Sequence, residues 1–255
     1  QGEEIPCYTD VKYISRDLVM LLDYENKVCH LLDSLFNSLS FYILSGSPTQ
    51  LCVAGQGEIA VSLPHNQTIQ FLSIIDNIII PTRKITTRSE SYGLSVVSQD
   101  EMIVSGPCRD GRYYWSIISM DGKEKSYHEF DGAGCSWTYA ALNASKTFLY
   151  VSVYEDNSLH CFDLDSKKKN FTFKHQDLKG PQAVTIDRDD NVYVVGNNSH
   201  NIFQLSSDGA FIQTTTNIVI KNPMAMCFNE DCGMCLLSCW KNKDLHIFRL
   251  ALAWD

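Results

Sequence analysis

Short apolar segments recur along the chain at nearly constant intervals. The stretch EMIVS has counterparts along the whole sequence, namely LVMLL at 18–22, EIAVS at 58–62, EMIVS itself at 101–105, FLYVS at 148–152, VYVVG at 192–196 and MCLLS at 234–238. Successive copies lie 40 to 47 residues apart. A period of this length indicates a repeat protein, so we expect one structural unit to be built six times.

Each repeat contains four short apolar runs separated by polar turns. The clearest copy is 180–216, where the runs QAVTID, NVYVVG, NIFQLS and AFIQTTT are divided by RDD, by NNSH and by the tight turn Ser207-Asp208-Gly209. Four short strands in a repeat of about 43 residues are typical of a propeller blade. The EMIVS-like strand would be the second of each blade, and it is apolar throughout because neighbouring sheets cover both of its faces.

The repeats predict an all-β fold, a six-bladed β-propeller of four-stranded antiparallel blades that forms a single domain over 1–255. We expect the blades at approximately 9–46, 47–86, 92–131, 137–175, 180–216 and 222–252. The sixth repeat has no fourth apolar run, whereas Gly2 to Tyr8 belong to no blade. We therefore expect 2–8 to supply the outer strand of the sixth blade and to close the ring, since closure removes exposed sheet edges.

The segment GPQAVTIDRDDNVYVVGNNSHNIFQLSSDGAF at 180–211 resembles an NHL repeat, and GLSVVSQDEMIVSG at 93–106 and NPMAMCFNED at 222–231 keep parts of the same pattern. Recurring WD, kelch and YWTD words are absent. Six-bladed NHL-like propellers are similar to the C-terminal domain of tripartite-motif E3 ubiquitin ligases, in which RING, B-box and coiled-coil domains precede the propeller. The resemblance implies a cytoplasmic substrate-recognition module, monomeric in isolation, whose parent protein oligomerises through the coiled coil. The family also includes RNA-binding propellers.

The charge of the chain bears on its partners. Its 30 acidic residues exceed its 21 Lys and Arg residues, and the net charge of −9 disfavours RNA, because binding to phosphates requires many basic side chains. The one basic run, at 167–169, is expected to form a solvated hairpin tip. No apolar run is long enough to span a membrane, and QGEEIPCYTD at the start lacks the features of a secretory signal.

Ten cysteines raise the question of a metal site, above all Cys227, Cys232, Cys235 and Cys239. Because Cys235 occupies the same place in its repeat as Tyr193, we expect these cysteines to be small buried hydrophobic residues. A zinc site or disulfide bonds remain as alternatives. Four matches to the N-glycosylation motif, at Asn66, Asn143, Asn170 and Asn197, are interpreted as coincidental because the motif is short. We expect no cofactor.

An enzymatic function would require reactive groups that point into the central channel. The candidates are Asp187, Asn229 and Asn143 at the ends of first strands, where capping of a turn explains such residues. No combination of nucleophile, base and orienting group is recognisable, so we expect the chain not to be an enzyme. A metal-dependent six-bladed hydrolase or lyase is the enzymatic alternative.

The remaining candidate function is recognition by loops. In a propeller, the loops between second and third strands and those between blades share one face. Aromatic and arginine side chains dominate interface energies, so this face is predicted to bind a protein or peptide. The alternative is that each ring only covers the end of its own blade. The candidate partner-binding residues are Tyr92, Arg109, Arg112, Trp137, Tyr154, Asn198, His200, Trp240 and Lys241.

Overall fold

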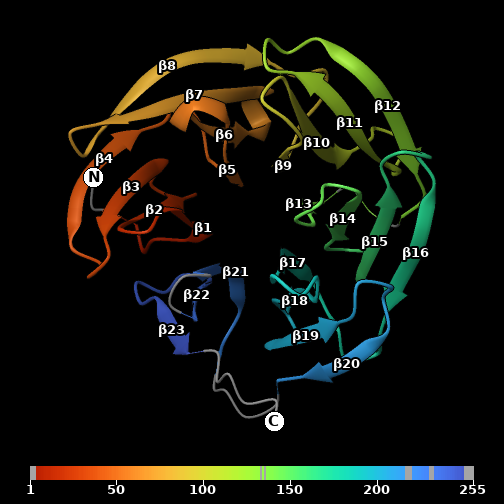
Figure 1. Cartoon of the computed structure of the whole chain (residues 1–255). Helices are drawn as coiled ribbons and strands as arrows, with labels where there is room; N and C mark the ends of the chain where they lie inside the picture. The colour runs from red at the N-terminus through yellow and green to blue at the C-terminus, as the bar shows by residue number, and fades with distance from the viewer. Residues whose placement is uncertain (1–3, 133, 135, 216–219, 230–232, 250–255) are drawn as a thin grey trace.

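A computed structural model describes residues 4–132, 134, 136–215, 220–229 and 233–249. Six twisted antiparallel sheets surround a central axis, and the N-terminal blade lies next to the C-terminal one (Figure 1). The predicted all-β, six-bladed propeller is therefore confirmed. The helical segments among the described residues are two short 3-10 turns, η1 (Gly55–Gly57) and η2 (Pro64–Asn66). None of the helical segments that the structure describes has the length and apolar character needed to span a bilayer.

The first three blades consist of four strands each. Blade one contains β1 (Tyr8–Ser15), β2 (Leu18–Asp23), β3 (Val28–Asp33) and β4 (Ser38–Ile43). Blade two contains β5 (Leu51–Val53), β6 (Ile59–Leu63), β7 (Thr68–Ile75) and β8 (Ile78–Thr86). Blade three contains β9 (Gly93–Val96), β10 (Glu101–Pro107), β11 (Tyr113–Ser119) and β12 (Glu124–Phe130).

The last three blades complete the ring. Blade four contains β13 (Thr138–Leu142), β14 (Phe148–Val153), β15 (Ser158–Asp163) and β16 (Lys169–Lys174). Blade five contains β17 (Pro181–Ile186), β18 (Val192–Gly196), β19 (Asn201–Leu205) and β20 (Phe211–Thr214). The described part of blade six contains β21 (Pro223–Asn229), β22 (Met234–Cys239) and β23 (His246–Arg249).

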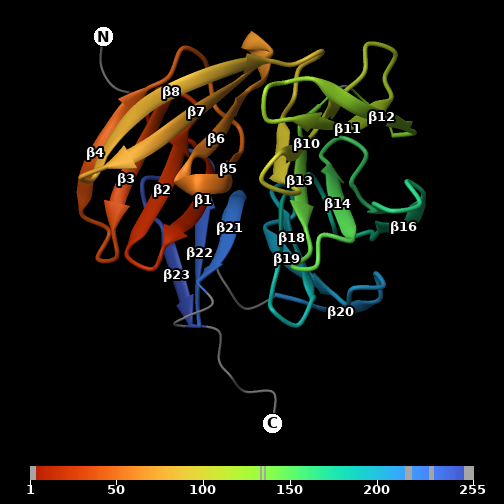
Figure 2. The same ribbon diagram turned by 45° about the horizontal axis from the view of Figure 1, so that its top comes forward.

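Strands follow one another from the axis to the outer wall of the ring, as the tilted view shows (Figure 2). Each EMIVS-like segment forms the second strand of its blade, as predicted, and these strands are almost wholly buried. Apolar side chains of adjacent blades interdigitate: Met20 and Leu31 of blade one pack with Leu51 and Ile59 of blade two. Burial on both faces explains why these strands are continuously apolar.

The serine that ends four of the EMIVS-like segments joins one blade to the next. Ser152 Oγ donates to Gln182 O at 2.5 Å, and Ser62 Oγ donates to Ser91 O. Ser105 Oγ is hydrogen-bonded to Thr138 Oγ1 at 3.0 Å. In each pair the partner belongs to the first strand of the following blade or to the loop before it. These buried hydroxyls replace lost contacts with water and fix the register between blades.

The ring closes through the same device rather than through a shared strand. Ser238 Oγ of blade six donates to Tyr8 O of blade one at 2.8 Å, and β1 packs against β21 and β22. Tyr8 begins the innermost strand of blade one, and Cys7 N donates to Asp23 Oδ1 in the same blade. The prediction that 2–8 form the outer strand of blade six is therefore wrong for the described residues 4–8.

Other expectations about polar residues are met. Asn143 Oδ1 accepts the N–H groups of Thr147 and Phe148 at 3.0 and 2.9 Å, which is the expected turn capping, and Asp187 Oδ1 likewise accepts Asn191 N at 2.9 Å. Lys167 lies in the turn between β15 and β16, as predicted for a hairpin tip.

Among the glycosylation motifs, Asn143 and Asn197 are buried, so neither side chain is open to a glycan.

Candidate functional site: a pocket at one mouth of the central channel

One face of the ring carries the loops between second and third strands together with the loops between blades. In four blades the first residue after the second strand donates its backbone N–H to the segment that precedes the first strand. Tyr154 N donates to Trp137 O at 3.2 Å, and Trp240 N donates to Asn222 O at 2.8 Å. This repeated bond places the two kinds of loop side by side. The residues at these positions therefore surround the channel mouth.

These loops enclose a pocket of about 560 Å³. Aromatic rings, a thioether and carboxamides dominate its wall, and it receives residues from blades three to six. Its lining consists of Tyr92, Ser136, Trp137, Tyr154, Glu155, Gln182, Asn197, Asn198, Asn222, Met224 and Trp240. A volume of this size and a mixed aromatic and amide wall are typical of ligand-binding sites.

Trp137 reaches across the mouth and joins opposite sides of the ring. The centroid of its ring lies 5.0 Å from the ring centroid of Tyr24 in blade one. It lies 5.9 Å from the ring centroid of Tyr92 at the start of blade three. Both contacts are tilted, with interplanar angles of 42° and 32°. Aromatic pairs at these distances stabilise one another beyond simple burial. The rings of Trp137 and Tyr92 therefore line one side of the pocket, and the ring of Tyr24 packs against Trp137.

A hydrogen-bonded group of side chains supports this aromatic wall. Tyr92 Oη donates to Glu90 Oε2 at 2.9 Å, and the other carboxylate oxygen lies 3.4 Å from His65 Nδ1. His65 Nε2 is hydrogen-bonded to the Tyr24 hydroxyl at 3.2 Å. Burial, reinforced by Glu90, raises the pKa of Tyr92 above its ordinary value, so the phenol stays protonated and continues to donate.

The structure brings most of the predicted recognition residues together. Tyr92, Trp137, Tyr154, Asn198 and Trp240 line the pocket. Two further predicted recognition residues, His200 and Lys241, lie beside the pocket. His200 Nδ1 accepts the Asn222 N–H at 3.0 Å, and the Lys241 ammonium lies 6.0 Å from the Trp240 ring centroid.

The two arginines named with them lie elsewhere. Arg109 and Arg112 belong to the loop between β10 and β11, and both are exposed. Arg112 pairs with Asp110 at 2.8 Å and with Glu129, both in blade three. Neither arginine lines the pocket. The structure therefore does not bring them into the same site as the aromatic residues.

Below the mouth, polar side chains cross the channel. Asp10 in β1 is fully buried, and its carboxylate accepts Leu51 N of blade two at 2.8 Å and the Tyr139 hydroxyl of blade four at 2.9 Å. Lys12 Nζ donates to the same tyrosine oxygen at 3.0 Å. Burial lowers the pKa of Lys12, but the attraction of Asp10 and Tyr139 outweighs this, so its pKa is raised and the ammonium stays charged.

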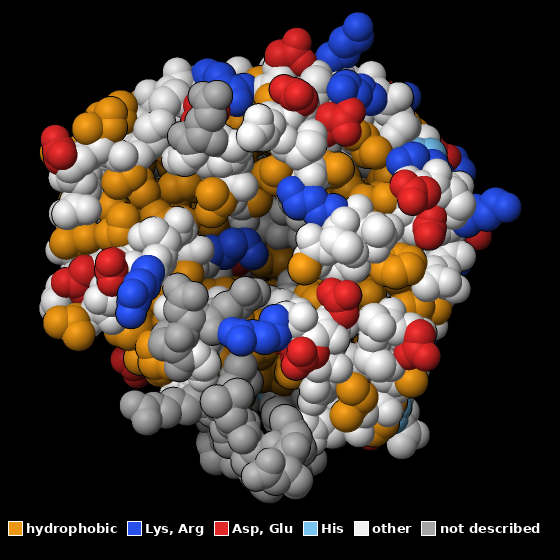
Figure 3. Space-filling model, in the orientation of Figure 1, with side chains coloured by type: hydrophobic (Ala, Val, Ile, Leu, Met, Phe, Trp, Pro, Cys, Tyr) orange, Lys and Arg blue, Asp and Glu red, His pale blue; other side chains and the backbone are white. Residues whose placement is uncertain are grey.

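Gln50 performs a similar task beside this cluster. Its Oε1 atom accepts the backbone N–H groups of Leu94 in blade three and Ala140 in blade four, at 2.8 and 3.1 Å. Its Nε2 atom donates to Ala140 O at 2.7 Å. These bonds link the residue before β5 of blade two to the innermost strands of blades three and four. From the opposite face, the centre of the ring is hollowed, with hydrophobic and basic side chains at its border (Figure 3).

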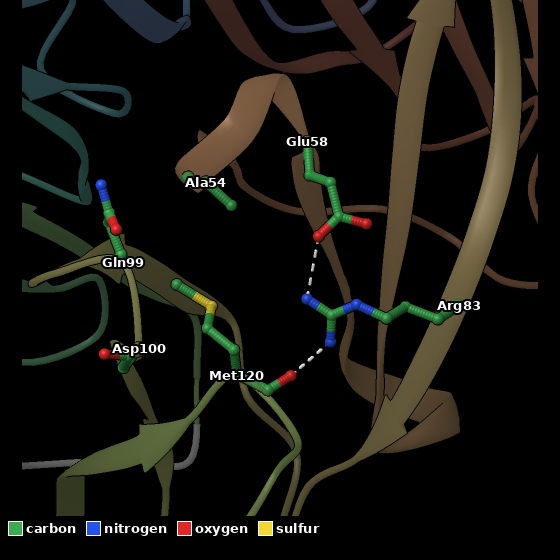
Figure 4. Close-up of a pocket in the computed structure, with 7 residues that line it drawn as sticks. Ala54, Glu58, Arg83, Gln99, Asp100 and Met120 are labelled. Carbon is green, nitrogen blue, oxygen red and sulfur yellow. Dashed lines mark hydrogen bonds and ion pairs between the residues drawn. The ribbon is translucent and has the colours of Figure 1, made fainter.

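A second, smaller cavity of about 210 Å³ lies between blades two and three (Figure 4). Arg83 dominates it: the guanidinium pairs with Glu58 at 2.9 Å, donates to Met120 O, and lies 3.5 Å from the Phe71 ring centroid. These contacts occupy the guanidinium group within the fold. The cavity is therefore better explained as a junction between blades than as a ligand site.

The described residues contain no group of three or more His, Cys, Asp or Glu side chains that could hold a metal ion. Cys227, Cys235 and Cys239 are buried in β21 and β22, as expected for small hydrophobic residues. Burial raises the pKa of Cys227 to about 12 and that of Cys239 to about 11, which disfavours the thiolate form that binds metals. Cys232 lies outside the described residues.

No protein-family model and no curated protein matches the chain. Solved propellers resemble its fold. The luciferin-regenerating enzyme superposes with a TM-score of 0.70 at 14% identity, covering 92% of this chain and 85% of that one. Virginiamycin B lyase from Staphylococcus aureus gives 0.66 at 14% over 98% and 86%, and the Dos1 propeller gives 0.66 at 13% over 96% and 79%. At these identities the likeness shows the propeller fold alone.

Sequence analysis missed several residues of the mouth and the channel. Tyr24 follows the second strand of blade one in DYEN, just as Tyr154 follows the second strand of blade four in VYED. Comparison of these two sequence segments could have identified Tyr24. Asp10 and Lys12 also left a signal, because they interrupt the first strand of blade one with charges. Glu155 and Met224 gave none that distinguishes them from ordinary loop and strand residues.

Proposed function

We propose that the chain is a protein-binding module that receives a segment of a partner protein in the mouth pocket. The observation that carries this proposal is the convergence of Trp137, Tyr154 and Trp240, from three loops, on one pocket of about 560 Å³. Large aromatic side chains provide much contact area at low entropic cost and are enriched at binding hot spots.

The carboxamides of the pocket suit an extended peptide. Gln182 makes no side-chain hydrogen bond to the described part of the chain, although it lines the pocket and is half-buried. Asn198 uses its Oδ1 atom to accept the Tyr154 hydroxyl at 3.1 Å, which leaves its amide N–H groups for a ligand. Amides of this kind can pair with both the N–H and the C=O groups of a peptide backbone. Binding without turnover is the activity that this wall supports.

We further propose that the propeller is of the NHL type and serves as the cytoplasmic substrate-recognition arm of a tripartite-motif ubiquitin ligase. The support is the resemblance of 180–211, which coincides with blade five from β17 to the start of β20. RNA is less favoured as the partner, because no Lys or Arg is found among the described residues that line the pocket. The test is whether the polypeptide that carries this propeller transfers ubiquitin to a partner captured at the mouth.

The binding proposal is tested by selecting peptides from a random display library on the wild-type protein. Selected peptides are then titrated against wild type and the double variant Trp137→Ala/Trp240→Ala by fluorescence polarisation. We expect affinity to fall at least about 100-fold, the loss of two hot-spot side chains. The control is Asp17→Asn in the turn between β1 and β2, on the opposite face. Peptides that bind the double variant as tightly as wild type would contradict the proposal, and so would a selection that yields no binder.

A further inference from the structure

We propose that the mouth pocket recognises a cationic side chain, lysine or arginine, on the partner segment. This inference rests on the proposed function and names the chemistry of the group that enters the pocket. It depends on three features of the described residues: the sign of the charge in the pocket wall, the way in which this charge is held, and the aromatic faces around it.

Charge in the wall of the pocket is negative. Of the described residues that line it, Glu155 alone is charged. Its backbone N–H donates to Ser136 Oγ at 3.1 Å, which ties the start of this turn to the loop before blade four. A second carboxylate, Glu90, lies directly behind the lining residue Tyr92. An anionic group on a ligand would be repelled here, whereas a cation would be attracted.

A glycine makes room for the Glu155 carboxylate. Gly134 adopts a φ of +101°, and a Cβ atom at this residue would lie 1.7 Å from Glu155 Oε2. Any other residue would therefore both strain the backbone and displace the carboxylate. The backbone thus approaches the carboxylate more closely than a side chain would allow. Glycine at this position therefore leaves the space that the negatively charged group occupies at the pocket wall.

Aromatic faces complete a site for a cation. Trp137, Tyr154 and Trp240 line the same pocket, and the faces of such rings attract ammonium and guanidinium groups within about 6 Å. The rim already contains one contact of this kind, because the Lys241 ammonium lies 6.0 Å from the Trp240 centroid. A negatively charged carboxylate and several aromatic rings in one wall are the groups that attract a basic side chain.

The experiment compares short peptides that differ in one side chain. Acetylated, amidated tripeptides Gly-Xaa-Gly, with Xaa lysine, arginine, norleucine or glutamate, are titrated into the protein while tryptophan fluorescence and NMR shifts are recorded. We expect saturable binding of the lysine and arginine peptides, weakened by added salt, and at least about 10-fold weaker binding of the norleucine and glutamate peptides. Equal binding of the norleucine peptide would overturn the inference.

Two substitutions should act in opposite directions. Glu155→Gln is expected to weaken binding of the lysine peptide about 5- to 10-fold, whereas Lys241→Met removes a competing cation and should strengthen it. Asp17→Asn, which removes one negative charge from the opposite face, is the matched control and should have no effect. Thermal melts establish that each variant is folded. An unchanged affinity in Glu155→Gln would refute the role of this carboxylate.

Failure of this inference can be told apart from failure of the proposed function. If library-selected peptides lose binding in Trp137→Ala/Trp240→Ala but not in Glu155→Gln, and contain no basic residue, the pocket binds proteins by other chemistry. The proposed function would then stand without the cationic site. If neither selected peptides nor the lysine tripeptide bind wild type, both proposals fail.

Discussion

The interior of the channel and its mouth both collect polar side chains from several blades, but the two regions use them differently. In the interior, Asp10 and Gln50 are 0% and 1% exposed, and their oxygens accept backbone N–H groups of neighbouring blades. At the mouth, Trp240 is 36% exposed and Gln182 has no side-chain hydrogen bond within the described part of the chain. Polar residues thus brace the ring in one region and remain available to a partner in the other.

This difference shows that hydrogen-bond satisfaction, rather than polarity, separates structural from recognition residues here. A buried polar group whose bonds are complete has nothing left for a ligand, and its removal leaves partners unsatisfied. A half-exposed group without a partner costs little when removed and can bind when a ligand arrives. The contrast predicts large losses of stability in the interior and large losses of binding, but not of stability, at the mouth.

The largest effect on stability is expected for Asp10→Ala. The change leaves the Lys12 ammonium without its counter-charge inside the ring and deprives Leu51 N and the Tyr139 hydroxyl of their acceptor. Removing one charge from a buried network of this kind leaves the opposite charge uncompensated, which costs about 3–5 kcal/mol of unfolding free energy. Urea denaturation measures the loss. Asp17→Ala at an exposed turn is the control and should change the free energy by less than about 0.5 kcal/mol.

A loss below about 1 kcal/mol for Asp10→Ala would mean that the charged cluster is not a brace. The interior would then resemble the mouth, and its polar side chains would become candidates for ligand binding.

A somewhat smaller loss is expected for Gln50→Leu. The leucine keeps the volume of the side chain but removes the acceptor of Leu94 N and Ala140 N and the donor to Ala140 O. Buried backbone groups left without partners cost about 1–3 kcal/mol each, so we expect a total of about 3 kcal/mol. Gln99→Leu, at an exposed position, is the matched control. If both variants unfold at the same urea concentration, the side chain of Gln50 does not hold the three blades together.

The blades could be predicted from sequence because they depend on local patterns. Each EMIVS-like segment forms the second strand of its sheet, and the turn at Ser207-Asp208-Gly209 follows β19 as expected. The closing strand could not be predicted in this way. An unassigned terminal segment fits any open edge, and only the three-dimensional structure shows Ser238 bound to Tyr8 and residues 4–7 lying on blade one.

The channel cluster was beyond the reach of sequence patterns for a related reason. Tyr139 and Asp10 are 129 residues apart, and Gln50 is 90 residues from Ala140. Such pairs meet only when the ring closes, and no period in the sequence encodes them. The mouth was more predictable, because loop position alone placed Trp137, Tyr154 and Trp240 on one face. Arg112 does not join them because it bonds to acidic residues of its own blade.

The smallest effect on stability is expected at the mouth itself. Trp240→Ala removes a large ring, but this side chain is 36% exposed at the pocket rim and its indole N–H bonds to none of the described residues. Because part of the ring is already in solvent, the unfolding free energy should fall by about 1–2 kcal/mol, less than for a fully buried ring. Trp115→Ala is the matched control: Trp115 is 1% exposed between blades three and four, and the same substitution there should cost about 3–5 kcal/mol. Differential scanning calorimetry on both variants measures the contrast. If Trp240→Ala destabilises the ring as much as Trp115→Ala, the rim tryptophan covers the end of its own blade, and the case for recognition at the mouth loses one of its three aromatic loops.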